Sequence, residues 1–307
     1  MANTFDVVIV GAGPAGLSGA LILGRCRRRV LVCDAGHPRN AASHELHGYL
    51  TRDCVEPSEL LRIGREQLRR YATVDLRTDE VTAACRVESG FEITINKTET
   101  ISSRKLLLAT GVVDRLPDVE GLAELYGRSV FHCPYCDGWE LRDQPIAIYG
   151  RENRGFGLAL ELTCWSRDLV ICSDGPADLS DADREQLVRL NIQVREEPIA
   201  RLEGNDGVLK QIVFANGEML ARRGMFFNTG QDQRCDLAAK LGCEFTERGA
   251  VWTGDYEMTN VPGLFVAGDA SRAVQLAIVA AAEGAEAAFA INKALIKEDL
   301  IAMDNPA

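Results

Sequence analysis

Cys133 and Cys136 are the residues whose type and spacing best suit redox chemistry, in the segment Cys133-Pro134-Tyr135-Cys136. Two thiols at this spacing can close a small disulfide loop, and such motifs lower the pKa of one thiol so that its thiolate can attack another disulfide. Asp137 follows directly, and its carboxyl group can exchange a proton with a thiol where burial raises its pKa. We therefore predict a redox-active pair with Asp137 as its acid. The alternative is two ordinary packed cysteines.

The overall composition narrows the class of protein. Among the ten cysteines no second Cys-x-x-Cys pair is present, so no metal site is expected, and the net charge of −11 disfavours a nucleic-acid partner. Residues 1–6 lack the basic and apolar segments of a signal peptide, and glutamates and a glycine interrupt the most apolar stretch, at residues 274–291. We expect a cytoplasmic protein without a membrane span, in which most other cysteines are reduced.

A glycine-rich segment after a predicted strand at residues 5–10 is typical of a dinucleotide-binding turn: Gly11-Ala12-Gly13-Pro14-Ala15-Gly16. The first glycine permits the tight bend, the second lets a pyrophosphate approach the backbone, and the third allows the following helix to pack closely. That helix offers unpaired N–H groups to the phosphates. Asp34 ends the next predicted strand, where a carboxylate can accept hydrogen bonds from an adenosine ribose and repels a 2′-phosphate. The pattern predicts FAD or NAD rather than NADP.

A second strand–turn–helix–strand unit begins at residue 146 and repeats the order of the first. In the same way, the strand and Thr-Gly of residues 226–230 repeat the pattern of residues 107–111. We predict an α/β fold of two Rossmann-like three-layer nucleotide-binding domains, with the second inserted into the first. The FAD-binding domain is predicted at residues 1–113 and 244–307, and the central NAD(P)H-binding-like domain, which carries the Cys-x-x-Cys, at residues 114–243.

Two segments near the C-terminus add cofactor candidates. Gly268 and Asp269 follow a predicted strand and suit hydrogen bonding to the ribityl or phosphate groups of a flavin. Gln275 and Leu276 start the last predicted helix, whose N–H groups and dipole can stabilise negative charge on a reduced flavin ring. We interpret two loop histidines, His44 and His47, as structural rather than as proton carriers. The predicted cofactor contacts are Gly11, Gly13, Pro14, Ala15, Gly16, Asp34, Ala109, Thr110, Gly111, Gly268, Asp269, Gln275 and Leu276.

The order of G-x-G-x-x-G, A-T-G, C-x-x-C-D-G, a second glycine turn and G-D-A resembles the low-molecular-weight thioredoxin reductases over nearly the whole chain. The resemblance implies that Cys136 faces the flavin, that Cys133 exchanges with a partner, and that Asp137 is the acid. It further implies a homodimer whose partner is a thioredoxin-like protein or a small dithiol or disulfide. Residues 133–140, with Trp139, also resemble the dithiol oxidases of disulfide-containing natural products, which usually carry His at the position of Asp137.

The second glycine turn departs from the thioredoxin reductase pattern. That family binds NADPH through G-x-G-x-x-A and a downstream His-Arg-Arg cluster, whereas this chain has Gly150-Arg151-Glu152-Asn153-Arg154-Gly155 and then Ser173-Asp174-Gly175. Asp174 would repel a 2′-phosphate, so NADPH is not expected as the direct electron donor. Four alternatives stay open: an orthodox NADPH-dependent thioredoxin reductase, an O2-dependent dithiol oxidase, a diflavin-linked enzyme with a second flavin as donor, and a non-catalytic flavin redox sensor. The sequence leaves the donor, the partner and the direction of electron flow undetermined.

Overall fold

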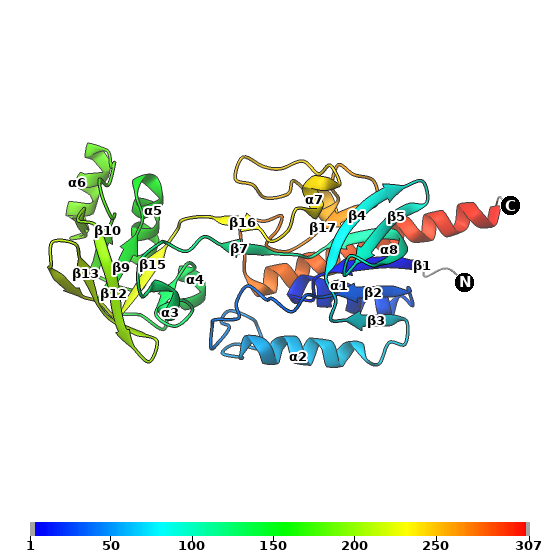
Figure 1. Ribbon diagram of the computed structural model, residues 1–307, viewed down its shortest axis with the longest axis horizontal. Coiled ribbons are helices and arrows are strands. Elements are labelled where there is room, and N and C mark those ends of the chain that lie inside the picture. Colours follow the sequence, from blue (N-terminus) through cyan, green and yellow to red (C-terminus); the bar gives the residue numbers. More distant parts are fainter. Residues whose placement is uncertain (1–3, 305–307) are drawn as a thin grey trace. The chain divides into compact units, whose positions relative to one another are not determined.

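The computed structural model describes residues 4–304 and divides into two compact units (Figure 1). Unit 1 comprises Met1–Ala41, Tyr49–Val113 and Asp232–Ala307, and unit 2 comprises Ala42–Gly48 and Asp114–Gln231. The first three residues, which form part of the segment examined for an export signal, lie outside the described part of the chain.

Unit 1 is built on a seven-stranded sheet in the order β3-β2-β1-β6-β5-β4, with β17 also paired to β6. The long strand β6 makes this branching possible: its first half pairs with β5 in antiparallel orientation, and its last residues pair with β17 in parallel orientation. The strands are β1 (Thr4–Val10), β2 (Val30–Cys33), β3 (Val74–Arg77), β4 (Val81–Val87), β5 (Gly90–Ile95), β6 (Glu99–Leu108) and β17 (Leu264–Val266).

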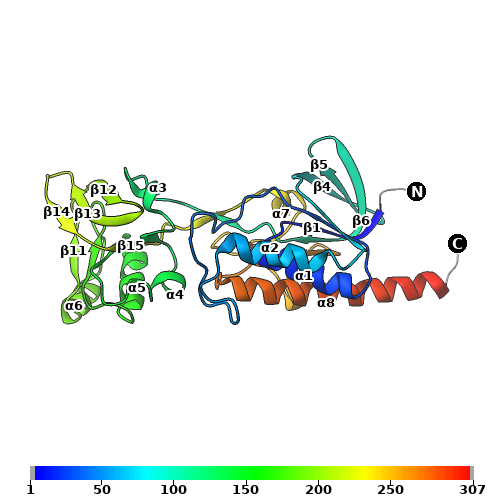
Figure 2. The ribbon, with the colours of Figure 1, turned by 90° about the horizontal axis from the view of Figure 1, so that it is seen from below.

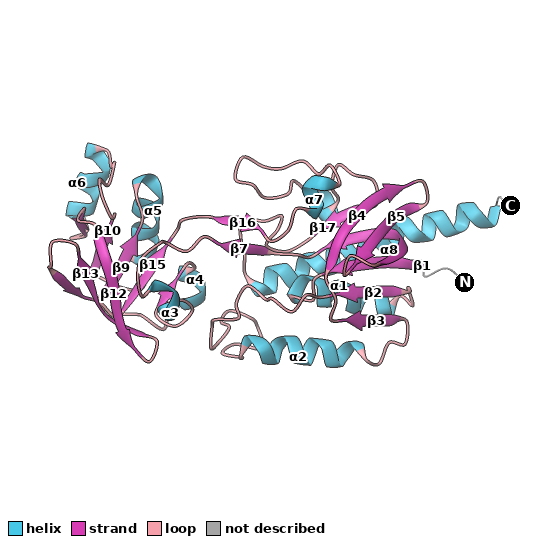
Figure 3. Ribbon diagram, viewed as in Figure 1, coloured by secondary structure: helices cyan, strands magenta, loops and turns pink. Residues whose placement is uncertain are grey.

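Both faces of the unit 1 sheet are buried, as the apolar run of β1 requires. Val7 and Ile9 face one core with the helices, whereas Val8 and Val10 face a second core with the β4–β5 hairpin, because side chains alternate along a strand. Figure 3 separates the strands from the helices. The helices of unit 1 are α1 (Pro14–Arg25), α2 (Pro57–Leu68), α7 (Leu237–Lys240), the 3-10 turn η1 (Asp255–Glu257) and α8 (Ala277–Asp304).

Close contact between α1 and α8 stabilises the helical layer, and Figure 2 shows α1, α2 and α8 together beside the sheet. Gly284 lies at this contact, and a Cβ there would overlap the backbone of Ala15. A glycine in the middle of a helix costs about 1 kcal/mol relative to alanine. Here it lets the two backbones meet, so the last helix is held against the first.

Unit 2 repeats the same three-layer plan with a five-stranded parallel sheet in the order β11-β10-β9-β15-β8. One face packs against α5 and α6 and the other against the antiparallel strands β12-β13-β14. The predicted α/β class of two Rossmann-like domains is confirmed. The elements are α3 (Leu122–Leu125), β8 (Val130–Phe131), α4 (Pro134–Asp137), β9 (Ile146–Tyr149), α5 (Glu152–Leu162), β10 (Leu169–Cys172), α6 (Asp181–Arg189), β11 (Gln193–Arg195), β12 (Ile199–Asn205), β13 (Val208–Phe214), β14 (Met219–Ala221) and β15 (Gly224–Phe227).

The chain passes between the units along β7 (Val112–Asp114) and β16 (Gln231–Gln233), which pair with each other. The second crossing therefore lies at 231/232, which differs from the predicted 243/244. The reason is packing: Leu237 and Ala238 of α7 lie in the core of unit 1. Residues 42–48 also group with unit 2, although their place in the sequence assigned them to the first domain. Among the described residues, no helix combines the length and apolarity that crossing a bilayer requires.

Candidate redox centre and cofactor-binding turns

Cys133 and Cys136 form a disulfide that spans the first turn of α4, with their Cα atoms 5.3 Å apart. Cys133 occupies the N-cap position, and Pro134 follows as the first helical residue, where its fixed φ suits a helix start. The backbone N–H of Cys136 donates to Cys133 Sγ at 3.1 Å. The start of α4 thus holds the sulfur of Cys133 against the backbone of Cys136.

Asp137 closes the same short helix and is half-buried. Burial, and to a lesser extent the negative charge of Glu140, raise the pKa of Asp137 to about 7. A carboxyl group with such a pKa can give and take a proton at neutral pH. The arrangement therefore joins a disulfide and a proton-exchanging group within five residues.

The glycine turn of unit 1 is shaped by backbone contacts that leave no room for side chains at two positions. Gly11 has φ +102°, and a Cβ there would overlap the carbonyl of Ala109; a Cβ on Gly16 would overlap the carbonyl of Gly11. Gly13 differs, because a Cβ there would have nothing within 4 Å. Gly13 is also the N-cap of α1 and provides no side-chain cap for its first N–H groups. The turn thus fits a pyrophosphate that approaches Gly13 and the start of α1.

The other predicted cofactor residues of unit 1 meet at the same edge of the sheet. Because β2, β1, β6 and β17 run parallel, their carboxyl ends lie side by side, and a predicted segment follows each of them. These segments are Gly11 to Gly16 after β1, Asp34 after β2, Ala109 to Gly111 after β6, and Gly268 and Asp269 after β17. Gln275 and Leu276, predicted to start the last helix, precede it instead: α8 begins at Ala277, and the N–H of Ala280 donates to the carbonyl of Leu276.

Three arginines that the sequence patterns did not indicate bind the acidic groups of this edge. Arg39 Nη1 lies 2.8 Å from Asp269 Oδ2 and 2.7 Å from Gln275 Oε1. Arg65 of α2 forms an ion pair with Asp34, which also accepts a hydrogen bond from the N–H of Ala12. The third is Arg272. Arg39 and Arg65 had no recognisable signal, because each pair joins distant segments of the chain.

Arg272 binds two buried carboxylates beneath the Gly268 turn. It donates to Glu283 Oε1 at 2.9 Å and to Glu257 Oε1 at 2.6 Å, and Glu283 Oε2 accepts the N–H of Gly268 at 2.8 Å. Burial is the main reason that the pKa of Glu283 rises to about 7. Since one arginine serves two carboxylates, this cluster fixes the turn at the end of β17 and can retain a proton at neutral pH.

At the second glycine turn, the side chains of Arg151 and Asp174 are bound to other groups of the chain. Arg151 is at the N-cap position of α5, but its side chain turns to the end of β10: its Nε donates to the carbonyl of Ser173 at 2.8 Å, and a second guanidinium nitrogen donates to the carbonyl of Asp174. The Asp174 carboxylate accepts the N–H of Ile199 at 2.8 Å and the hydroxyl of Tyr149 at 3.2 Å. The position where the resemblance would place a basic cluster for a 2′-phosphate thus holds an anchored aspartate with Arg151 folded over its backbone.

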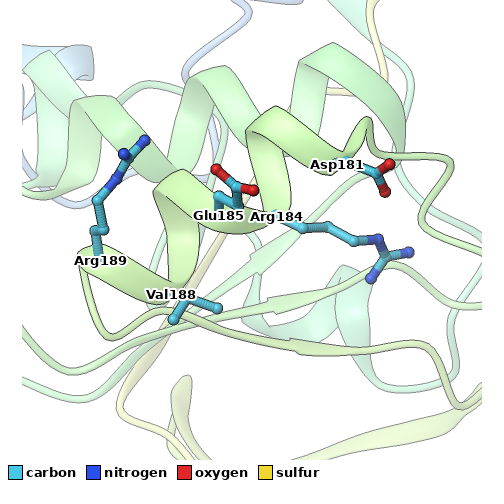
Figure 4. A pocket seen from close by; sticks show the side chains of 5 residues that line it. All are labelled: Asp181, Arg184, Glu185, Val188 and Arg189. Carbon is cyan, nitrogen blue, oxygen red and sulfur yellow. The ribbon is translucent and has the colours of Figure 1, made fainter.

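One pocket outside these sites lies along α6, with a volume of about 610 Å³ (Figure 4). Only residues of this helix line it: Asp181, Arg184, Glu185, Val188 and Arg189. Arg184 is already paired with Glu196 at 2.8 Å. None of the predicted redox or cofactor residues lines this pocket, and we assign it no role.

Solved structures with this fold are numerous. Residues 5–284 match the family described as pyridine nucleotide-disulphide oxidoreductase. A probable thioredoxin reductase of Arthroderma benhamiae is 31% identical, over 88% of this chain and 74% of the relative. The structure of a putative thioredoxin reductase, TrxB, of Bacillus anthracis is 34% identical with a TM-score of 0.90, covering 96% of this chain and 99% of that one. The structure of HlmI is 36% identical with a TM-score of 0.94, covering 98% and 95%.

The fold and the disulfide thus define a disulfide oxidoreductase built from two nucleotide-binding domains. The chain belongs to the pyridine nucleotide-disulphide oxidoreductase family, among its thioredoxin reductase-like flavoproteins. This family implies FAD as a cofactor, and the prediction of a thioredoxin reductase-like, FAD-dependent enzyme is confirmed at this level.

Gly13 offers a test of the cofactor turn that separates folding from binding. We expect Gly13→Ala to fold with the thermal stability of the wild-type apoprotein, because the added Cβ meets no protein atom within 4 Å. Its flavin content should fall at least about tenfold, because the same Cβ stands where a pyrophosphate must approach. Flavin absorbance per chain and thermal unfolding measure the two effects. As a control, Gly157→Ala adds a Cβ on α5 at a position that also has nothing within 4 Å and an ordinary helical backbone. Full flavin content in Gly13→Ala would exclude this turn as the binding site.

Proposed function

We propose that this protein is an FAD-dependent thiol–disulfide oxidoreductase that moves electrons between a flavin in unit 1 and the Cys133–Cys136 pair, and on to a partner dithiol or disulfide. We further propose that NADPH is not its direct electron donor. The proposal rests chiefly on the Cys133–Cys136 disulfide in α4 and on the proton-exchanging Asp137 beside it.

The residues proposed to hold the flavin are those at the carboxyl edge of the unit 1 sheet. Gly13 and the first N–H groups of α1 would face the pyrophosphate, Asp34 the adenosine ribose, and Asp269 the ribityl chain. Asp269 is held for this task by Arg39, which offsets its charge where a phosphate must also sit. Bound FAD would supply a carrier that accepts and releases an electron pair.

Each cysteine is assigned one part of the exchange. In the reduced pair, the Cys133 thiolate attacks a partner disulfide, forms a mixed disulfide and releases one partner thiolate. Cys136 then attacks Cys133 Sγ, which closes the enzyme disulfide and releases the second partner thiolate. Asp137 holds the proton that Cys136 gives up, and its pKa of about 7 supports this role. Partner oxidation follows the same steps in reverse, and the resemblance supports Cys136 as the thiol that faces the flavin.

The second glycine turn supports the exclusion of NADPH as direct donor. Arg151 uses its guanidinium on the carbonyls of Ser173 and Asp174 rather than leaving it for a phosphate. Asp174 is anchored by Ile199 and Tyr149, so its negative charge stays where a 2′-phosphate would bind. A dithiol or a second flavin would then replace NADPH as the source of electrons.

The oligomeric state and the cellular compartment of the enzyme are proposed from two features of the chain. Exposed apolar residues recur along one stripe of α8 at positions 289, 296, 300 and 303, which supports a homodimer; they are Phe289, Ile296, Leu300 and Met303. Eight cysteines in the described part of the chain form no disulfide, which supports the reducing cytoplasm as its compartment. A thioredoxin-like protein or a small dithiol or disulfide is the proposed partner.

Variants of the two cysteines test the mechanism. Turnover with any dithiol or disulfide should vanish in both Cys133→Ser and Cys136→Ser, and Cys133→Ser should show a long-wavelength band because the Cys136 thiolate lies against the flavin. Cys172→Ser, which alters a buried free cysteine, is the control and should keep the exchange activity. Wild-type turnover in both single variants would show that the pair is structural.

Rapid mixing of the holoenzyme with NADPH under argon tests the choice of donor. Each charged hydrogen bond lost from a phosphate is worth about 1.5–3 kcal/mol, so the loss of two should weaken NADPH binding by a factor on the order of a hundred or more. We expect the flavin absorbance to bleach far more slowly with NADPH than with a dithiol. Bleaching by micromolar NADPH within milliseconds would instead identify an orthodox NADPH-dependent reductase.

A further inference from the structure

A buried triad of charged residues lies beneath the turn that follows β17. Glu283 of α8 accepts the N–H of Gly268 with Oε2 at 2.8 Å, and its other oxygen accepts Arg272 Nε at 2.9 Å. Arg272 also donates from Nη2 to Glu257 Oε1 at 2.6 Å. The Glu257 side chain is fully buried, and that of Glu283 is 9% exposed. Glu257, Arg272 and Glu283 therefore form one unit that holds the backbone of Gly268, and we call it the Arg272 triad.

The second carboxylate of the triad reaches Arg272 from a strained backbone. Tyr256 and Glu257 have φ of +56° and +64°, in the left-handed region that residues other than glycine rarely adopt. Residues in this conformation persist only where the surrounding structure holds them, and they concentrate at functional sites. Glu283 alone would already neutralise Arg272. The strained turn thus adds one acid that the arginine cannot neutralise, although burying charged groups is costly.

The net charge of the triad depends on a single proton. With both carboxylates ionised the triad carries one negative charge, whereas with one of them protonated it is neutral. Burial is the main reason that the pKa of Glu283 rises to about 7, and burial also raises the pKa of Glu257. Because the two carboxylates share one arginine, they titrate as a coupled pair. The triad therefore gains and loses this proton near neutral pH.

The groups that face the triad from neighbouring segments do not supply a second positive charge. Glu286, which is exposed on α8, adds negative charge near Glu257, and the hydroxyl of Thr253 donates to Glu257 Oε2 at 3.4 Å. On the side of the cofactor turn, Asp269 pairs with Arg39 at 2.8 Å. In the contacts described for residues 4–304, the negative charge of the fully ionised triad is therefore not offset.

We propose that the Arg272 triad positions the Gly268–Asp269 turn for the flavin in its neutral, proton-bearing form, and that loss of this proton weakens FAD binding. The inference rests on the proposed function, since it takes this turn as part of the FAD site. Glu283 is a positioning residue, because it fixes the N–H of Gly268, whose φ is +83°. A negative charge added beneath the turn repels the pyrophosphate of FAD, and salt screens buried charges only weakly.

FAD binding to flavin-free protein as a function of pH tests the proposal without turnover. Fluorescence quenching gives the dissociation constant from about pH 6 to about pH 8.5. We expect the wild-type affinity to fall about tenfold over this range, which corresponds to a difference of about one pKa unit between the free and the FAD-bound triad.

Two variants separate the charge of the triad from its hold on the turn. Glu257→Gln should bind FAD at all pH values with the affinity that the wild type has at low pH, because Arg272 then meets a single carboxylate. Glu283→Gln should also lose the pH dependence, but with affinity about tenfold lower throughout, because one amide oxygen cannot accept from both Gly268 and Arg272. Glu247→Gln, which alters an exposed carboxylate of unit 1, is the control and should keep the wild-type profile.

A wild-type affinity that does not change with pH would overturn the inference, and so would a wild-type pH profile in Glu257→Gln. Wild-type affinity in Glu283→Gln would show that Glu283 does not position the turn. If the flavin-free wild type takes up no FAD at any pH, the proposed FAD site itself fails. Thermal unfolding of each flavin-free variant shows whether it folds, and Glu257→Gln leaves the bond between Glu283 and Gly268 in place if Glu283→Gln proves unstable.

Discussion

The backbone contact between Gly11 and Ala109 is the constraint on which the cofactor edge of this protein depends. Parallel pairing of β1 with β6 brings these residues together, and the carbonyl of Ala109 occupies the space that a Gly11 Cβ would need. The first turn of α1 is equally tight, because Gly16 packs on the carbonyl of Gly11. With these two contacts closed, α1 starts at the sheet edge and Gly13 is left as the open position. Asp34 and the Gly268 turn join the same edge because β2 and β17 are parallel to β1 and β6.

Acidic residues at an anion-binding edge create an electrostatic problem, which arginines from distant segments solve. Asp34 pairs with Arg65, Asp269 with Arg39, and Glu283 with Arg272. Each arginine lies against its carboxylate and offsets part of the negative charge that would repel a phosphate. The chain as a whole carries a net charge of −11, so these local pairs, rather than the overall charge, support the proposal that this edge binds a dinucleotide.

An arginine and an aspartate also lie at the second glycine turn, but there each binds backbone or hydroxyl groups of the chain. Arg151 binds backbone carbonyls, and Asp174 is fixed by Tyr149 and Ile199, so both side chains are held by other groups of unit 2. The two domains share one three-layer plan, yet the two turns differ in the side chains beside them: an anchored aspartate and a carbonyl-bound arginine at the second, an open Gly13 at the first. This difference is the physical basis for proposing a flavin in unit 1 and for doubting a direct role of NADPH.

Most of what the sequence could predict came from short local patterns. Glycine spacing, the β-branched strand before it and the Cys-x-x-Cys are short-range signals, and they indicated the fold class, the turns at the carboxyl edge and the disulfide. The roles of the individual site residues remain predictions. Arg39, Arg65 and Arg272 could not be found in this way, because their partners are distant in sequence and only the tertiary fold brings them together. The second crossing between the units was misplaced for a related reason: Leu237 and Ala238 bury in the core of unit 1, and no local feature of that segment distinguishes the two cores.

The proposed function requires that the flavin and the Cys133–Cys136 pair form one electron path. Anaerobic titration of the holoenzyme with dithionite, followed at the flavin absorbance and by thiol counting, tests it most directly. Since the flavin and a disulfide each take up an electron pair, the wild-type protein should accept twice as many electrons as Cys133→Ser or Cys136→Ser before the flavin is fully reduced. Equal electron uptake in all three proteins would show that the disulfide takes up no electrons from the flavin.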